Sequence, residues 1–137
     1  MGGGMPVDKI RLKAPVELSV AADAGMMLVV RLTTAGVVAR AGLTVDVMDN
    51  LKMATEEACS CLIGQENPPE RIALRFEGEE NSLVISVTAG EDGVRQGSFD
   101  EAELDVVRCI LEALADQVAF DVRDGWIRGI RMCTSLA

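Results

Sequence analysis

Apolar and polar residues follow two different periods along this chain, and the changes of period predict its secondary structure. Successive side chains of a strand point to opposite faces, so alternation predicts strands at residues 9–20, 71–76, 83–88, 118–123 and 126–132. Apolar positions three and four residues apart predict helices over about 23–41, 44–63 and 100–117. Asp124-Gly125 separates the last two strands, and this dipeptide is typical of a tight hairpin turn.

Local signals at the ends of the helices support these boundaries. Asp23, Thr44 and Asp100 each precede an apolar periodic segment, and their side chains can accept hydrogen bonds from the first free backbone N–H groups. Gly42 follows the first helix, where glycine readily takes the left-handed conformation that ends a helix, and Gly64 is expected to end the second helix.

The element order β-α-α-β-β-α-β-β predicts an α+β fold. Strands joined by tight turns pair antiparallel, and helices with one apolar stripe each cover one face of a sheet. We therefore expect a two-layer α/β sandwich with a mostly antiparallel sheet and its helices on one face. Residues 9–137 are expected to form a single domain after a flexible, glycine-containing tail at residues 1–8.

Composition narrows the classes of function. The net charge of −9 and the sequence pI near 4.4 disfavour nucleic acid as a partner. We expect no membrane span and no secretory leader, hence a cytoplasmic protein. Histidine is absent, which excludes Ser-His-Asp and Cys-His catalysis and histidine-ligated metals. The cysteines, at 59, 61, 109 and 133, are expected to be reduced core residues, and no metal site is predicted.

Three stretches, 17–42, 47–63 and 111–125, resemble the anti-sigma-factor serine kinases of bacteria, members of the histidine-kinase-like (GHKL) ATPase superfamily. The resemblance extends over nearly the whole chain. It implies an ATP pocket between the helices and the sheet, closed by a lid that is short in this chain. It also implies phosphorylation of a serine on an antagonist protein, sequestration of a sigma factor, and a homodimer.

The family's motifs are only partly present. At the end of the second helix, Glu57 matches the glutamate that acts as general base, but Cys61 replaces the asparagine that binds Mg²⁺. A thiol is a poor ligand for this hard cation. After the strand at 83–88, Ala89 replaces the aspartate that binds adenine, and of the motif's glycines only Gly93 is matched.

The phosphate-binding part of the pocket is altered as well. Only residues 94–103 separate Gly93 from the third helix, and Asp105-Val106-Val107 replaces the family's Gly-Leu-Gly. An aspartate there repels phosphate, and a valine prevents close backbone approach. Losing the adenine contact, the phosphate contacts and the metal ligand costs roughly 5 kcal/mol together, which weakens binding by about three to four decades. We therefore expect no cofactor.

One protein-binding feature of the family is present. Arg31 matches the arginine that these proteins present to the sigma factor and to the antagonist. The leading hypothesis is an anti-sigma-like regulatory protein, a pseudokinase that binds a sigma factor or an anti-anti-sigma-type partner without ATP.

Two alternatives stay open. The first is an active ATP- and Mg²⁺-dependent serine protein kinase, with Glu57 as base and Asp92 or Glu91 in place of the missing carboxylate. The second is a redox or small-molecule sensor that uses Cys59 and Cys61.

Overall fold

The computed structural model of the protein describes residues 10–90 and 95–135. Its elements follow the predicted order, with a short 3-10 helix added before the first α-helix. They are β1 (Val16–Ala21), η1 (Ala24–Met26), α1 (Met27–Ala41), α2 (Val45–Ile63), β2 (Arg71–Glu79), β3 (Ser82–Ala89), α3 (Glu101–Glu112), β4 (Gln117–Arg123) and β5 (Trp126–Ser135). The predicted tail at 1–8 lies outside the described residues.

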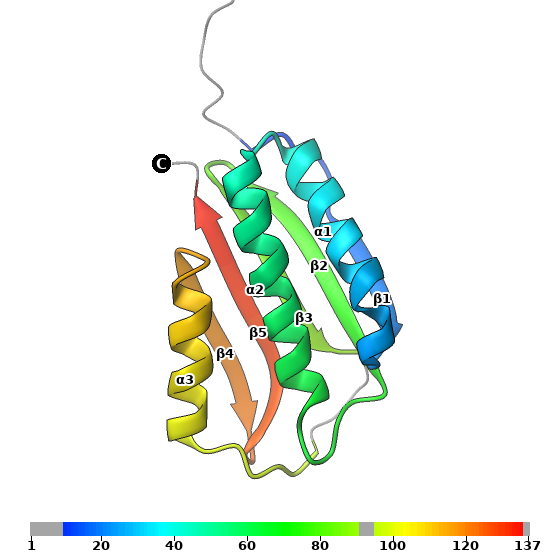
Figure 1. The fold of residues 1–137 in the computed structure, drawn as a ribbon, viewed down its shortest axis with the longest axis vertical. Coiled ribbons are helices and arrows are strands. Elements are labelled where there is room, and N and C mark those ends of the chain that lie inside the picture. The colour runs from blue at the N-terminus through cyan, green and yellow to red at the C-terminus, as the bar shows by residue number, and fades with distance from the viewer. Residues whose placement is uncertain (1–9, 91–94, 136–137) are drawn as a thin grey trace, which may run out of the picture.

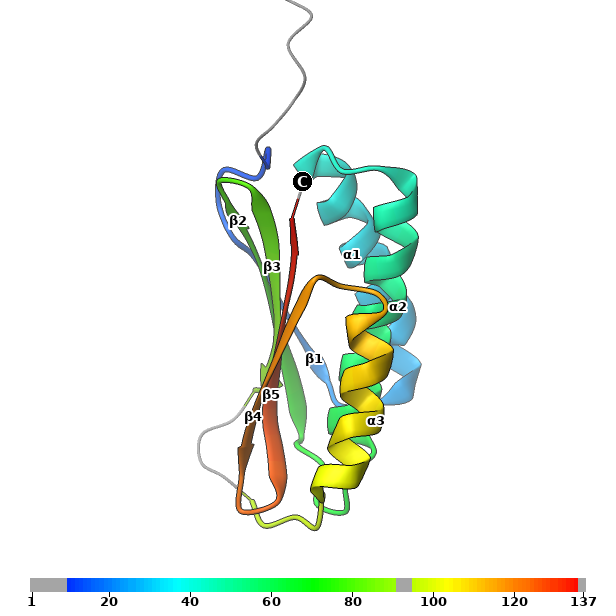
Figure 2. The same cartoon turned by 90° about the vertical axis from the view of Figure 1, so that its left-hand side faces the viewer.

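The strands form one sheet in the order β1-β2-β3-β5-β4, and each neighbouring pair is antiparallel. The helices α1, α2 and α3 lie side by side on one face of this sheet (Figure 1). Seen from the side, the helices form one layer and the sheet the other, and no helix of the described residues covers the opposite face of the sheet (Figure 2). The predicted α+β two-layer sandwich is confirmed.

Thr44 and Asp100 cap α2 and α3 as predicted, whereas Asp23 caps the 3-10 helix η1 that precedes α1. Asp23 accepts a hydrogen bond from the Gly25 N–H at 3.0 Å, and Thr44 accepts one from the Val47 N–H at 3.3 Å. Asp100 similarly caps α3. Gly42 ends α1 with φ of 84°, the left-handed conformation that glycine adopts without strain.

The core lies between the two layers. β2 places Ile72, Leu74 and Phe76 against the helices, as its alternation predicts, and each is at most 1% exposed. α1 and α2 pack closely because small side chains, including Thr34 and Ala58, are buried on them. The hairpin turn at Asp124-Gly125 is also confirmed, since both residues have positive φ, 53° and 70°.

Several sequence predictions need correction. β1 begins only at Val16, after Pro15, and α3 ends at Glu112, about one turn earlier than predicted. Ile110, one of the apolar periodic positions that predicted this helix, is 41% exposed because α3 packs at the margin of the helical layer. Among the cysteines only Cys59 is fully buried, since Cys109 lies exposed on the outer side of α3 and the other two are intermediate.

The segment Ala24–Ala41 has a mean hydropathy of 1.3 and is long and apolar enough to cross a membrane by those two measures. In the fold it is a core helix, with Val30 and Val38 fully buried. Its hydropathy is high because its outward side is apolar as well: Leu28 and Leu32 are 57% and 64% exposed. An apolar surface on a packed helix is typical of a protein-binding face.

Candidate functional site

The first candidate site is the seam between α2 and α3, where α2 places Glu57 and Cys61 one turn apart. Glu57 lines a hollow of about 410 Å³, together with residues of both helices, among them Met53 and Ile110. Both Glu57 and Cys61 are partly exposed. The structure therefore brings the candidate base to an open groove, on the same helix as the residue at the metal-ligand position.

The two cysteines of α2 are protonated thiols at neutral pH. Burial, together with smaller effects of the nearby charges of Glu57 and Glu103, raises the pKa of Cys61 to about 12. Burial also raises the pKa of Cys59 to about 12, with a smaller effect from Glu56. Because the nucleophilic and metal-binding form of cysteine is the thiolate, both thiols are chemically quiet at physiological pH.

The adenine-binding position is part of the core. Ala89 is the last residue of β3 and is 5% exposed. The following residue, Gly90, donates its N–H to the Arg71 carbonyl at 2.9 Å, which continues the pairing of β3 with β2. The candidates Gly93, Glu91 and Asp92 lie outside the described residues.

The start of α3 is occupied by acidic side chains. The Asp100 carboxylate accepts a hydrogen bond from the Glu103 N–H at 2.8 Å, and Glu101 and Glu103 lie in the first turn. These carboxylates already complement the positive end of the helix dipole, and they would repel a phosphate group. Asp105-Val106-Val107 lies inside α3, beyond its first turn. Backbone N–H groups at such positions form the hydrogen bonds of the helix itself and are not free to bind phosphate.

The segment 95–100, at the position of the lid, is hydrogen-bonded to its surroundings. Gly97 donates its N–H to the Asp124 carbonyl at 3.1 Å, and Phe99 donates to the Gly125 carbonyl at 2.9 Å. The Asn67 side chain donates to the carbonyl of Gln96 at 2.8 Å. These contacts hold the segment against the β4–β5 turn and the loop after α2.

A second group of contacts at this end of the molecule was not predicted from the sequence. The Gln65 amide oxygen accepts from the Ile127 N–H at 2.7 Å, and its amide nitrogen donates to the Ile127 carbonyl at 3.0 Å. Trp126, which is fully buried, donates its indole N–H to the Asn67 carbonyl at 2.7 Å. The partners are about 60 residues apart, and no local sequence signal identifies them.

The described residues do not provide the donor set that ATP and Mg²⁺ require. Cys61 offers a neutral thiol to the metal, and Ala89 offers no carboxylate to adenine. The remaining hollow at the start of α3, about 230 Å³, is lined by Glu66 and Glu103.

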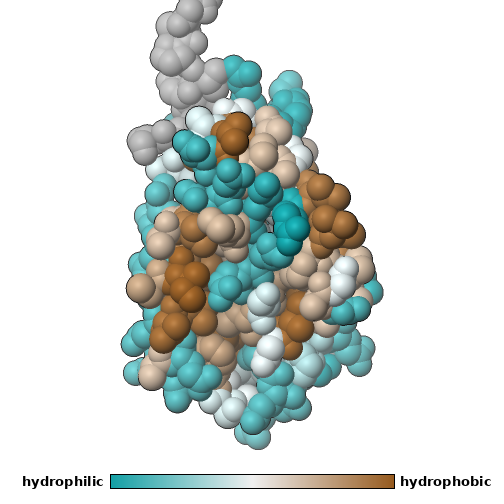
Figure 3. All heavy atoms as spheres, viewed as in Figure 1, coloured by the Kyte–Doolittle hydropathy of each residue, from teal (hydrophilic) through white to brown (hydrophobic). Residues whose placement is uncertain are grey.

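The second candidate site is the outer face of α1. The Arg31 side chain is 44% exposed and binds Glu56 of α2 at two points, Nη2–Oε1 at 2.5 Å and Nε–Oε2 at 3.2 Å. This hydrogen bond and the charge of Glu56 raise the pKa of Arg31 above its ordinary value. Arg31 is flanked along α1 by three exposed apolar residues, Leu28, Val29 and Leu32. Figure 3 shows a hydrophobic area over α1.

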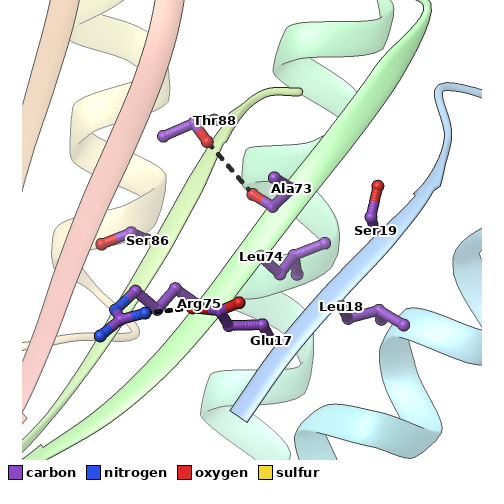
Figure 4. A pocket seen from close by; sticks show the side chains of 8 residues that line it. All are labelled: Glu17, Leu18, Ser19, Ala73, Leu74, Arg75, Ser86 and Thr88. Atoms are coloured by element: carbon purple, nitrogen blue, oxygen red, sulfur yellow. Dashed lines mark hydrogen bonds and ion pairs between the residues drawn. The ribbon is translucent and has the colours of Figure 1, made fainter. Parts of the chain in front are cut away.

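The helix-free face of the sheet has a hollow of its own, about 440 Å³ in volume (Figure 4). Small side chains line it on β1, β2 and β3, and Thr88 donates to the Ala73 carbonyl at 3.4 Å. Arg75 pairs with Glu17 at its rim. None of the site residues predicted from the sequence lies there.

The two-layer fold is consistent with the histidine-kinase-like ATPase sandwich that the sequence resemblance implies. The chain is similar to the serine-protein kinase RsbW of Bacillus velezensis, with 32% identity over 95 residues, 66% of this chain and 57% of the relative. The Bacillus subtilis protein of that name is 30% identical over 94 residues, with the same coverage, and that of Bacillus thuringiensis is 34% identical over 87 residues, 62% of this chain and 51% of the relative.

These similarities confirm the predicted relationship to the anti-sigma-factor serine kinase family. The chain spans just over half the length of the curated relatives that it matches. No protein-family model matches it.

Proposed function

We propose that this protein is an anti-sigma-type regulator that binds a sigma factor or an anti-anti-sigma-type protein through α1, without ATP. The observation that carries the proposal is the contrast between its two candidate sites. The nucleotide positions hold a neutral thiol at Cys61 and a methyl group at Ala89. The outer face of α1 keeps an exposed, oriented arginine among apolar side chains.

The chemistry of this face suits a protein partner. Arginine is enriched in interface hot spots, where its guanidinium combines apolar contact with directed hydrogen bonds. Arg31 is held by Glu56, so less side-chain entropy is lost when a partner binds. Leu28 and Leu32 provide the apolar surface around it.

The direct test is a titration of the protein with sigma factors and anti-anti-sigma proteins of its own genome, with and without ATP and Mg²⁺. We expect one of them to bind with a Kd that is unchanged by nucleotide. Failure of every candidate to bind would remove the proposal, and binding that needs ATP would refute its nucleotide-independent part.

Calorimetry with ATP and Mg²⁺ tests the nucleotide part separately. We expect ATP not to saturate the protein below millimolar concentration. The altered contacts cost roughly 5 kcal/mol of binding free energy, which weakens the affinity by about three to four decades. A Kd tighter than about 100 μM, corresponding to roughly −5.5 kcal/mol, would overturn this expectation.

The second candidate function is an active ATP-dependent serine protein kinase. It is favoured by the names of the relatives and by Glu57, which keeps the position of the general base at an open groove. Incubation with radiolabelled ATP and an anti-anti-sigma protein tests it. Phosphate transfer that is lost in Glu57→Gln would establish this function in place of the first.

A homodimer is part of the proposal. β1 is an edge strand of the sheet, and its outer side is available for pairing in the described part of the chain. Light scattering on the purified protein measures its oligomeric state directly. A mass near 14.6 kDa, that of the monomer, at micromolar concentration would contradict the dimer.

A further inference from the structure

Three hollows follow the seam between α2 and α3 from one end to the other. At the start of α2 a hollow of about 220 Å³ lies between Val47, Asn50 and the residues that follow α3. The hollow of about 410 Å³ continues it past Met53 and Ile110. A third hollow, of about 230 Å³, lies at Gly64 and Glu103, so hollows lie at both ends and in the middle of the seam.

The seam is open because α3 is weakly packed. Leu111 is its only fully buried residue within the described structure. Ile110 and Val106 are 41% and 62% exposed, and Met53, on the facing side of α2, is 52% exposed. Figure 3 shows a hydrophobic surface area over α3, and more polar surface separates it from the hydrophobic area over α1.

The charge of the seam has one sign. Among the described residues that line the three hollows, none is a lysine or an arginine. The carboxylates that line them are Glu56, Glu57, Glu66, Glu103, Glu112 and Asp116. Arg108 of α3 is placed over the Phe120 ring, 4.8 Å from its centroid, and is not among the lining residues.

A buried acceptor adds an independent observation. Thr134 is 8% exposed and lines the hollow at the start of α2, beside Glu112 and Asp116. Its hydroxyl has no hydrogen-bond partner within the described part of the chain. A buried polar group without a partner is costly, and the end of a long cationic side chain would satisfy it.

We propose that the α2–α3 seam binds a basic amphipathic helix of a partner protein. The apolar residues Met53, Ile110 and Leu114 would contact the apolar stripe of that helix. Its lysines and arginines would pair with Glu57 and Glu103, since Glu56 is already paired with Arg31. α3 has 12 residues and is therefore about 18 Å long, which matches about three turns of a docked helix. Nucleic acid and anionic lipid are repelled by the same carboxylates.

This surface adjoins the Arg31 face of α1 at Glu56, but Arg31 does not line it, and the inference does not depend on which protein binds to α1. A labelled peptide of about 16 residues, with leucines at i, i+3, i+4 and i+7 and arginines on both flanks, is the probe. Fluorescence anisotropy should show saturable binding that weakens as salt is added, because exposed charges are screened. Its analogue with glutamates in place of the arginines should not bind.

Two matched double variants locate the site. Glu57→Gln with Glu103→Gln removes two charges that line the seam and should raise the peptide's Kd about tenfold. Glu101→Gln with Asp105→Asn removes the same charge from exposed positions of α3 that do not line it, and should leave the Kd within about twofold. Equal weakening by both pairs would show non-specific attraction and overturn the site.

Measurements on the wild-type protein keep the test independent of folding defects. Backbone amide NMR shifts should move for Met53, Ser60 and Ile110 as peptide is added, and those of β1 should stay unchanged. Absence of binding, equal binding of the glutamate peptide, or shifts confined to other surfaces would each refute the inference. Failure of this test would leave the α1 proposal intact, because Arg31 does not line the seam.

Discussion

Arg31 of α1 and Glu56 of α2 form a two-point ion pair across the outer surface of the helical layer, although 25 residues separate them in sequence. The pair joins the two candidate surfaces. Its arginine belongs to the apolar face of α1, and its glutamate lines the α2–α3 seam. The ion pair holds the Arg31 side chain in one orientation on the face that we propose binds the partner.

Arg31→Ala should weaken binding of the protein partner by about tenfold or more, as removal of an interface arginine commonly does. Glu56→Gln should weaken it about threefold, because it frees the guanidinium without removing it. The thermal midpoint should change little in either variant, since exposed ion pairs contribute little to stability. Titration calorimetry and a thermal melt measure both properties.

Arg75→Ala is the matched control, because Arg75 also forms an exposed ion pair, with Glu17, but on the opposite face. It should leave partner binding unchanged. If it weakened binding as much as Arg31→Ala, the α1 face could not be the contact surface.

The raised pKa of Cys59 predicts a loss of stability in alkali. Burial raises this pKa from its ordinary value of 9.0 to about 12, so the folded protein keeps a proton that the unfolded chain releases. The free energy that this proton contributes to the folded state is complete below about pH 9 and is lost as the pH rises toward 12. The loss reaches about 1.4 kcal/mol per pH unit for one thiol.

Urea unfolding at neutral pH and at about pH 10.5 measures this decline. The free energy of unfolding of Cys59→Ala should fall less between the two pH values than that of the wild type, because the contribution of one buried thiol is missing. The variant Cys109→Ala, at an exposed cysteine, should behave as the wild type does. Parallel declines for all three proteins would contradict the burial of Cys59 as the cause.

Gln65→Ala should destabilise the protein by about 1–3 kcal/mol, because it leaves both the N–H and the carbonyl of the buried Ile127 without their side-chain partner. The single tryptophan, Trp126, is the neighbouring residue and reports unfolding by its fluorescence. Gln117→Ala, at an exposed position of β4, should cost less than about 0.5 kcal/mol. Equal effects would mean that the Gln65 contacts contribute nothing specific.

Two glycine-to-alanine substitutions should have opposite signs. A methyl group at Gly125 would lie 2.5 Å from the Gly97 carbonyl oxygen, and its φ of 70° disfavours other residues. Gly125→Ala should therefore cost about 1–3 kcal/mol. Gly36 lies inside α1 with no atom within 4 Å of the added methyl group, so Gly36→Ala should stabilise by about 0.5–1 kcal/mol. Chemical denaturation of both variants measures the sign of each change in the free energy of unfolding.

The sequence alone identified the features that are determined by residues close together in the chain. Capping by Asp23 and Thr44, the left-handed Gly42 and the Asp124-Gly125 turn depend on a few neighbouring residues, and all are confirmed. The alternation of β2 predicted the burial of Ile72, Leu74 and Phe76, because one face of the sheet is covered by helices, whereas in β3 Val84 is buried as well as Leu83 and Ile85. The family resemblance added the positions of Glu57, Cys61, Ala89 and Arg31.

Contacts between distant segments were decided only by the tertiary structure. The 3.6-residue period tolerates a shift by one stripe, so it did not show that Cys59 is buried more deeply than Cys61. It also did not show that Ile110 is exposed, because a helix at the margin of a layer has fewer neighbours to cover its apolar side. The Arg31–Glu56 pair and the Gln65–Ile127 contacts join residues 25 and 62 positions apart, and only the packing of helices on the sheet brings such side chains together.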